Sequence, residues 1–139
     1  MRKFSLLFSS IVLIAGCRES SKIASVAGTV KLDGKPLPNA SVSFQPIGEG
    51  RLNPGPGSTG LTDDKGEYTL VVTGGGSGAV VGMHRVEISC PTDRGKYRPE
   101  DDRRPRPRER VPLHYNAQST LSFEVKPGKN TANFELLSK

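Results

Sequence analysis

Residues 60–72 read Gly-Leu-Thr-Asp-Asp-Lys-Gly-Glu-Tyr-Thr-Leu-Val-Val. The acidic pair and Gly66 separate two segments of strand-forming residues, and a glycine supplies the positive φ that a tight turn needs. After the turn, large apolar residues alternate with more polar ones, which predicts a strand with one buried face. The residues expected inside are Tyr68, Leu70 and Val72. This stretch therefore predicts a β-hairpin.

Similar patterns recur on both sides of this hairpin. The further strand-like segments are 25–32, 41–45, 83–90, 119–125 and 131–136. The last two are expected to pair as a hairpin around residues 126–130. Segments rich in Gly and Pro separate the strands, and no segment has the period of a long helix. The chain therefore predicts an all-β fold, a single seven-stranded β-sandwich of roughly a hundred residues.

The first 16 residues predict a signal peptide. A basic start at Arg2 and Lys3 precedes a short apolar run at 4–14 and small residues at a cleavage position. The run is too short to span a bilayer comfortably. Residues 13–17, Leu-Ile-Ala-Gly-Cys, resemble the lipobox of bacterial lipoproteins. The resemblance implies that Cys17 becomes the lipidated first residue of the mature protein.

A lipidated Cys17 predicts a permanent membrane anchor. Several acyl chains at about 0.8 kcal/mol per buried methylene hold such an anchor in the bilayer. Arg18 follows the cysteine, where some inner-membrane lipoproteins carry Asp, so the expected location is the bacterial cell envelope, with the outer membrane preferred over the inner. Residues 17–24 then form the lipidated cysteine and a tether that reaches on the order of 15 Å. Residues 25–139 form the domain.

Positive charge is concentrated in one segment. The chain has a net charge of +6, and removal of the signal peptide takes away two basic residues. Residues 94–110 hold eight basic and four acidic residues, which accounts for the whole remaining excess. The basic loop is expected at 91–116. Its candidate ligands for anionic lipid or an envelope polymer are Arg103, Arg104, Arg106, Arg108 and Arg110. The alternative is a solvated loop of mixed charge, and nucleic acid is not expected as a partner of an exported protein.

Two histidines are the candidates for chemistry. His84 and Glu87 have the His-x-x-Glu spacing of a zinc site, but residues three apart on a strand point to opposite faces. His114 has no carboxylate or thiol cluster near it in sequence, and no Gly-x-Ser-x-Gly elbow is present. We therefore expect no enzymatic activity, no metal and no cofactor. With Cys17 lipidated no intramolecular disulfide can form, and Cys90 is expected to be a small buried residue.

Motifs along the domain resemble the carboxypeptidase regulatory-like domain. They are Ser-Val-Ala-Gly-Thr-Val at 25–30, Asp-Gly-Lys-Pro-Leu at 33–37 with Ala40, and Thr62-Asp63 with Gly66 and Tyr68. Later matches resemble the version found in small planctomycete lipoproteins: Pro112, Tyr115, Lys-Pro-Gly at 126–128 and Asn130. The resemblance implies a transthyretin-like (prealbumin-like) sandwich without a catalytic site. The arginine-rich insertion and Leu113-His114 depart from it.

The sequence thus predicts a lipid-anchored envelope module with a structural or binding role. It is anchored at Cys17 and displays the loops 46–57, 73–82 and 91–116; its protein partner is not identified by these residues. The alternative is a small transthyretin-like hydrolase, or an enzyme-associated ligand-binding subunit, that uses His84 or His114.

Overall fold

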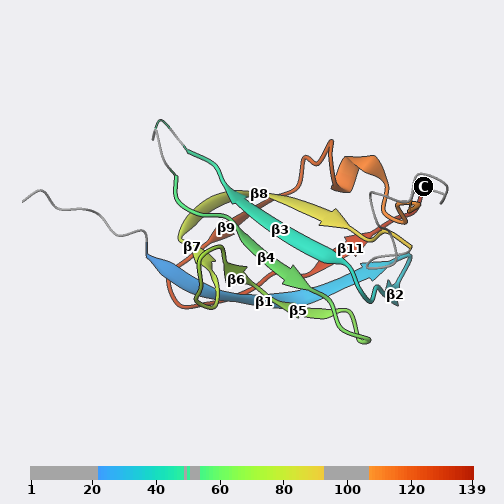
Figure 1. Ribbon diagram of the computed structural model, residues 1–139, viewed down its shortest axis with the longest axis horizontal. Coiled ribbons are helices and arrows are strands. Elements are labelled where there is room, and N and C mark those ends of the chain that lie inside the picture. The colour runs from blue at the N-terminus through green and yellow to red at the C-terminus, as the bar shows by residue number, and fades with distance from the viewer. Residues whose placement is uncertain (1–21, 49, 51–53, 93–106) are drawn as a thin grey trace, which may run out of the picture.

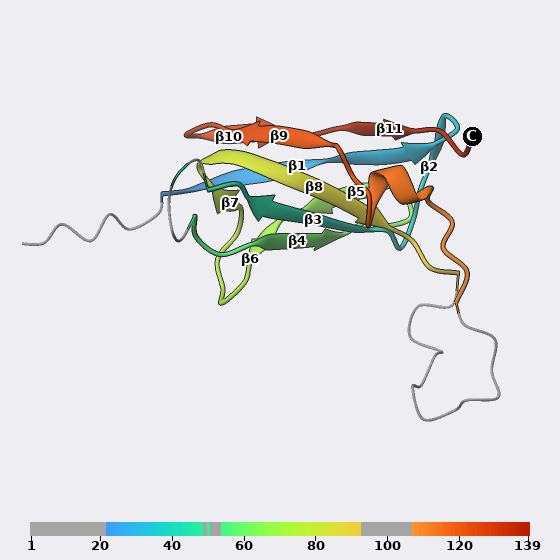
Figure 2. The same cartoon turned by 90° about the horizontal axis from the view of Figure 1, so that it is seen from above.

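The computed structural model describes residues 22–48, 50, 54–92 and 107–139. Over these ranges the chain forms eleven short strands and one three-residue 3₁₀ helix, η1 (Leu113–Tyr115). The expected all-β fold is confirmed, and the strands form two sheets that pack around one core (Figures 1 and 2). No helix in the described ranges has the length and apolar character needed to cross a membrane.

One sheet is organised around β1 (Ile23–Leu32), which begins two residues earlier than predicted. Three antiparallel partners of β1 are β2 (Lys35–Pro36), β5 (Glu67–Thr69) and β7 (Ala79–Val80). Two parallel partners are β10 (Lys129–Thr131) and β11 (Phe134–Leu136). Because β5 and β10 both pair with Ala27, they lie on opposite edges of β1.

The other sheet has five antiparallel strands in the order β6-β4-β3-β8-β9. Their bounds are β6 (Val71–Val72), β4 (Ser58–Leu61), β3 (Ser41–Pro46), β8 (Gly82–Ser89) and β9 (Ser122–Val125). The alternation predicted for β3 and β8 is confirmed, since Val42, Phe44, Val86 and Ile88 are all fully buried. These side chains face the sheet around β1 and form the centre of the core.

The turn at 63–66 forms as predicted, but the strand after it is divided. Gly66 has φ 73° and donates its N–H to the carbonyl of Asp63 at 3.0 Å. Tyr68 and Leu70 are buried, as their alternation indicates. However, β5 joins the sheet of β1 whereas β6 pairs with β4 in the other sheet. The chain crosses between the layers at Leu70, whose N–H donates to the carbonyl of Val26.

The predicted hairpin between 119–125 and 131–136 is wrong. β9 pairs with β8, whereas β10 and β11 pair with β1 in the opposite sheet, so the turn between them connects the two layers. Both segments are apolar on one face, and packing those faces across the core buries them as a hairpin face would. The ring of Phe44 lies 5.7 Å from that of Phe123 and 6.3 Å from that of Phe134, measured between centroids.

The strand count also differs, with eleven strands in the described part of the chain in place of the seven expected. The additional strands are short. β2 and β7 lie in segments predicted as turn or loop, and both complete the edge of β1. The predicted strands 67–72 and 131–136 are each interrupted after three residues or fewer, because the chain changes its partner or its path there.

The interruption between β10 and β11 lies over Gly28 of β1. A Cβ atom at Gly28 would be 1.8 Å from the carbonyl oxygen of Ala132. Tyr68 pairs with Gly28 in the ladder of β1 and β5, and its hydroxyl donates to the same carbonyl at 2.6 Å. Because Gly28 has no side chain, Ala132 can approach β1 closely. Tyr68, which lies on β5 at one edge of β1, can then reach Ala132 at the other edge.

The two ends of the sandwich carry different segments. The ten residues of β1 rise about 3.3 Å each, so the strand is roughly 30 Å long. Lys22 and the paired Pro46 and His84 lie at the end where β1 begins. The paired Ser41 and Ser89, β2 and the C-terminus lie at the end where β1 stops (Figure 1). We call the second end, with residues 89–92 and 107–111, the basic end.

Candidate functional site

The predicted site residues divide into two groups. Arg108 and Arg110 are described and lie next to the end of β8. Outside the described residues lie Cys17, Arg103, Arg104 and Arg106. The structure therefore places Arg108 and Arg110 together at the end of β8. The roles predicted for the four other residues stay predictions.

The basic end is built on a short backbone ladder. The N–H of Thr92 donates to the carbonyl of Arg108 at 2.9 Å, and the N–H of Arg110 donates to the carbonyl of Cys90 at 3.2 Å. Pro91 and Glu109 form the bridge between them. The hydroxyl of Thr92 accepts a further bond from the N–H of Arg108 at 3.2 Å. The backbone of both arginines is thus tied to the end of β8.

The carboxylate of Glu109 holds this ladder together. It accepts hydrogen bonds from the Ser89 hydroxyl at 2.6 Å, the N–H of Cys90 at 2.7 Å and the N–H of Val111 at 3.0 Å. Partial burial works to raise the pKa of Glu109, but the bond from Ser89 and the neighbouring N–H groups outweigh burial and lower the pKa. Glu109 is one of the four acidic residues in the segment 94–110, and its carboxylate serves the backbone of this ladder.

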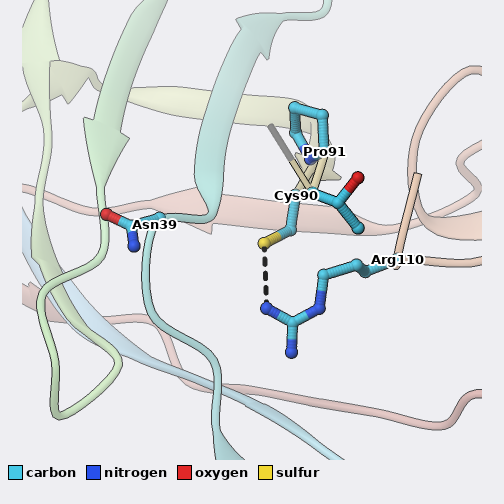
Figure 3. Close-up of a pocket in the computed structure, with 5 residues that line it drawn as sticks. Asn39, Cys90, Pro91 and Arg110 are labelled. Atoms are coloured by element: carbon cyan, nitrogen blue, oxygen red, sulfur yellow. Dashed lines mark hydrogen bonds between the residues drawn. The ribbon is translucent and has the colours of Figure 1, made fainter. Parts of the chain in front are cut away.

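A cleft of about 390 Å³ opens beside the ladder. It is lined by Asn39, Cys90, Pro91, Thr92 and Arg110 (Figure 3). Nη1 of Arg110 lies 3.9 Å from Sγ of Cys90, and the thiol donates to the carbonyl of Pro38 at 3.5 Å. Cys90 is 1% exposed, which confirms the prediction of a buried cysteine.

Asn39 reaches the cleft from the turn between β2 and β3. Its φ of 58° is left-handed, a conformation that asparagine tolerates better than most residues. Thr62 holds this turn, because its buried hydroxyl accepts from the N–H of Ala40 at 2.8 Å and donates to the carbonyl of Leu37 at 2.6 Å. The sequence does not indicate the cleft, because its residues are distant in the chain and only two of them, Arg110 and Cys90, are predicted to bind or to be buried.

Neither histidine lines this cleft. His84 and Glu87 lie on opposite faces of β8, as predicted. His84 is 0% exposed, its Nδ1 donates to the carbonyl of Gly82 at 3.0 Å, and its Nε2 has no partner among the described residues. His114 is exposed in η1, with its ring centroid 4.0 Å from that of Tyr115. The described ranges contain no group of three His, Cys, Asp or Glu side chains that could hold a metal.

His84 predicts a dependence of stability on pH. Burial lowers the pKa of His84 below its ordinary value of 6.5, and the bond to Gly82 opposes this only in part. The unfolded chain therefore binds a proton at this position at a higher pH than the folded chain, so the free energy of unfolding falls as the pH falls below about 6.5. Replacing His84→Phe removes the charge and the unpartnered nitrogen, and we expect the unfolding free energy of this variant to vary less between pH 7 and pH 5.

The control for this prediction is His114→Phe, because His114 is exposed. Urea unfolding at several pH values measures the difference. The same acid sensitivity in the wild type and the His84→Phe variant would contradict the assignment.

Comparisons with known proteins identify no relative: no family model matches this chain, and no curated protein or solved structure does.

Proposed function

We propose that the protein is a lipid-anchored module of the bacterial cell envelope that binds an anionic partner and catalyses no reaction. Its domain is a transthyretin-like sandwich of the carboxypeptidase regulatory-like type, a proposal supported by the motifs at 25–40 and 60–68. The observation that carries the binding role is the position of the basic end, at the opposite end of β1 from Lys22.

An anchor at Cys17 fits the arrangement of the described domain. Four residues separate Cys17 from Lys22 in the sequence, and Lys22 leads directly into β1. The carbonyl of Lys22 accepts from the N–H of Val81, so the first described residue is already tied to the domain. A chain held at Cys17 is therefore attached to the membrane at the end of the sandwich where β1 begins.

The partner of the basic end follows from the same arrangement. A tether that reaches on the order of 15 Å keeps the attached end of the domain close to the lipid surface. Arg108 and Arg110, however, are tied to Thr92 and Cys90 just after β8, at the opposite end of the sandwich from the start of β1, a strand roughly 30 Å long. Surface electrostatic attraction to lipid falls off within about one Debye length, near 8 Å at physiological salt. Of the two candidate partners, this geometry favours an anionic envelope polymer over the bilayer that holds the anchor.

The burial of His84 supports a role without catalysis. A side chain with no exposed surface cannot meet a substrate, and its Nδ1 is already engaged with Gly82. His114 is exposed, but its described ring contact is with Tyr115 rather than with an acid or a nucleophile. The alternative of a hydrolase therefore gains no support from either histidine.

Replacement of Cys17→Ser tests the anchor, and Cys90→Ser is its matched control. Both variants lose one of the two cysteines in the chain. We expect the wild type and the Cys90→Ser variant to sediment with membranes in a bacterium that processes lipoproteins, and the Cys17→Ser variant to leave the membrane fraction after a salt wash. A Cys17→Ser variant that fractionates like the wild type would exclude the lipid anchor.

A further inference from the structure

The guanidinium of Arg110 retains most of its hydrogen-bonding capacity. An arginine side chain carries five N–H donors, and a thiol is a weak acceptor. Among the described residues, the side chain of Arg110 meets one acceptor, Sγ of Cys90, at 3.9 Å. The ion pair found within the described ranges joins Arg85 to Glu87 and does not involve Arg110. The guanidinium in the cleft is therefore available to an anion.

Two neutral polar residues line the same cleft. The side-chain amide of Asn39 makes no hydrogen bond to another described residue, but Figure 3 shows it turned away from the guanidinium, so Asn39 contributes to the wall of the cleft. The hydroxyl of Thr92 accepts from the N–H of Arg108 and keeps its own hydrogen for another acceptor. The turn that carries Asn39 is held by the buried Thr62, so this wall of the cleft is an ordered backbone.

In the described part of the chain, two acids close in sequence to residues that form or support the cleft, Glu109 and Asp63, are engaged with backbone groups. The carboxylate of Glu109 accepts bonds from Ser89, Cys90 and Val111 on the other side of the ladder. The carboxylate of Asp63 accepts the N–H groups of Lys65 and Glu67 within its own turn. The described lining of the cleft thus contains a cation and no acid.

The donor set fits a carboxylate. A guanidinium binds the two oxygens of a carboxylate through a planar, bidentate pair of hydrogen bonds, and one such cation balances its single charge. A phosphate dianion is better matched by several cations. Pro91 and the buried Cys90 supply a less polar wall for the carbon atoms that carry the carboxylate.

We propose that this cleft binds a carboxylate group through Arg110, with the hydroxyl of Thr92 as a further donor. The inference rests on the proposed function for the identity of the partner, which is then a polymer that bears carboxylates, such as a polyuronate. The cleft itself is argued from its own contacts and does not depend on the anchor.

Cys90 provides a direct measurement, because its sulfur lies 3.9 Å from Nη1 of Arg110. The full-length protein is treated separately with iodoacetate and iodoacetamide, which are closely similar in size but differ in charge. In both reactions the sulfur displaces iodide and a carbon–sulfur bond forms, and peptide mass spectrometry reads the rate at Cys90 alone. The ratio of the two rates cancels the limited access to this buried thiol. If Arg110 holds the carboxylate of iodoacetate beside the sulfur, the rate with iodoacetate rises relative to the rate with iodoacetamide.

We expect the iodoacetate-to-iodoacetamide rate ratio to fall about tenfold or more in the Arg110→Ala variant. The Arg108→Ala variant is the matched control, since it removes the same charge from the same ladder outside the cleft lining. Arg110→Lys keeps the charge but loses the planar pair of donors, and we expect its ratio to fall as well. An unchanged ratio in Arg110→Ala, or an equal fall in Arg108→Ala and Arg110→Ala, would overturn the proposal.

Binding to polygalacturonate, with polyphosphate as the comparison, then tests the class of polymer. We expect the wild-type full chain to prefer polygalacturonate and the Arg110→Ala variant to lose that preference; a preference for polyphosphate would overturn the carboxylate assignment. The alkylation ratio does not involve the membrane. If Cys17 carries no lipid but Arg110→Ala lowers the alkylation ratio as expected, only the proposed location is rejected. If Cys17 is lipidated but Arg110→Ala leaves the ratio unchanged, only the cleft proposal is rejected.

Discussion

Replacing Gly28→Ala is expected to lower the free energy of unfolding of the domain by about 3 kcal/mol or more, a large share of the stability of a typical small domain. The added Cβ would lie 1.8 Å from the carbonyl oxygen of Ala132, and both groups belong to backbone that paired strands hold in place. Relief requires Ala132 to move away from β1. That movement also breaks the bond from the Tyr68 hydroxyl, which leaves a buried polar group without its partner.

The control for Gly28→Ala is Gly34→Ala. Gly34 has φ 79°, and a Cβ atom added there would meet nothing within 4 Å, so alanine costs only its backbone strain, about 1 kcal/mol. Urea unfolding followed by circular dichroism compares the two variants. Equal stabilities of Gly28→Ala and Gly34→Ala would show that the junction of Gly28, Tyr68 and Ala132 does not hold the sheet as described.

Replacing Glu109→Ala is expected to loosen the basic end at a cost of about 2–4 kcal/mol, because hydrogen bonds to a charged group contribute more than neutral ones. The N–H groups of Cys90 and Val111 lose their acceptor, and so does the hydroxyl of Ser89. Hydrogen exchange should then accelerate at Cys90, Arg110 and Val111, while the exchange of β1 stays close to that of the wild type.

The stability lost in the Glu109→Ala variant also depends on pH. The folded pKa of Glu109 lies below its ordinary value of 4.5, so its contribution to stability is fully present above that value and disappears as the pH falls through the folded pKa. The difference between the wild type and Glu109→Ala should therefore shrink in acid. Glu135→Ala, on the exposed side of β11, is the control and should change stability by less than about 0.5 kcal/mol. A loss in Glu135→Ala equal to that in Glu109→Ala would refute the special role of Glu109.

The burial of individual residues could be predicted wherever it depends on local alternation. Val42 and Phe44, Val86 and Ile88, and Tyr68 and Leu70 are all inside, because side chains on a strand alternate between faces whatever the strand pairs with. The positive φ of Gly66 was predictable for the same reason, since a turn depends on its own few residues.

The pairing of strands could not be predicted in the same way. The segments 119–125 and 131–136 are separated by a plausible turn, and both a hairpin and a crossing between layers bury their apolar faces. The observed crossing is compatible with Gly28, whose missing side chain leaves room for Ala132 between the two strands that run parallel to β1. That contact joins residues more than a hundred positions apart, and the sequence near either one does not reveal it.

The cleft could not be predicted from the sequence, for a related reason. Arg110 was a candidate because of its charge, and Cys90 was expected in the core because of its neighbours on the strand. Nothing in the chain indicated that Asn39, in a turn near the start of the domain, lines the same cleft as these two residues. The alternation of Arg108, Glu109 and Arg110 was the one local sign of a ladder at this position.

The intact mass of the mature protein is the sharpest test of the lipid anchor, and the anchor determines which end of the sandwich faces the envelope. The protein is expressed in a bacterium that processes lipoproteins, recovered from its membranes and analysed by mass spectrometry together with its N-terminal peptide. We predict a chain that begins at Cys17 and carries added acyl mass. A chain that keeps residues 1–16, or one that begins elsewhere with an unmodified Cys17, would contradict the anchor and the orientation that follows from it.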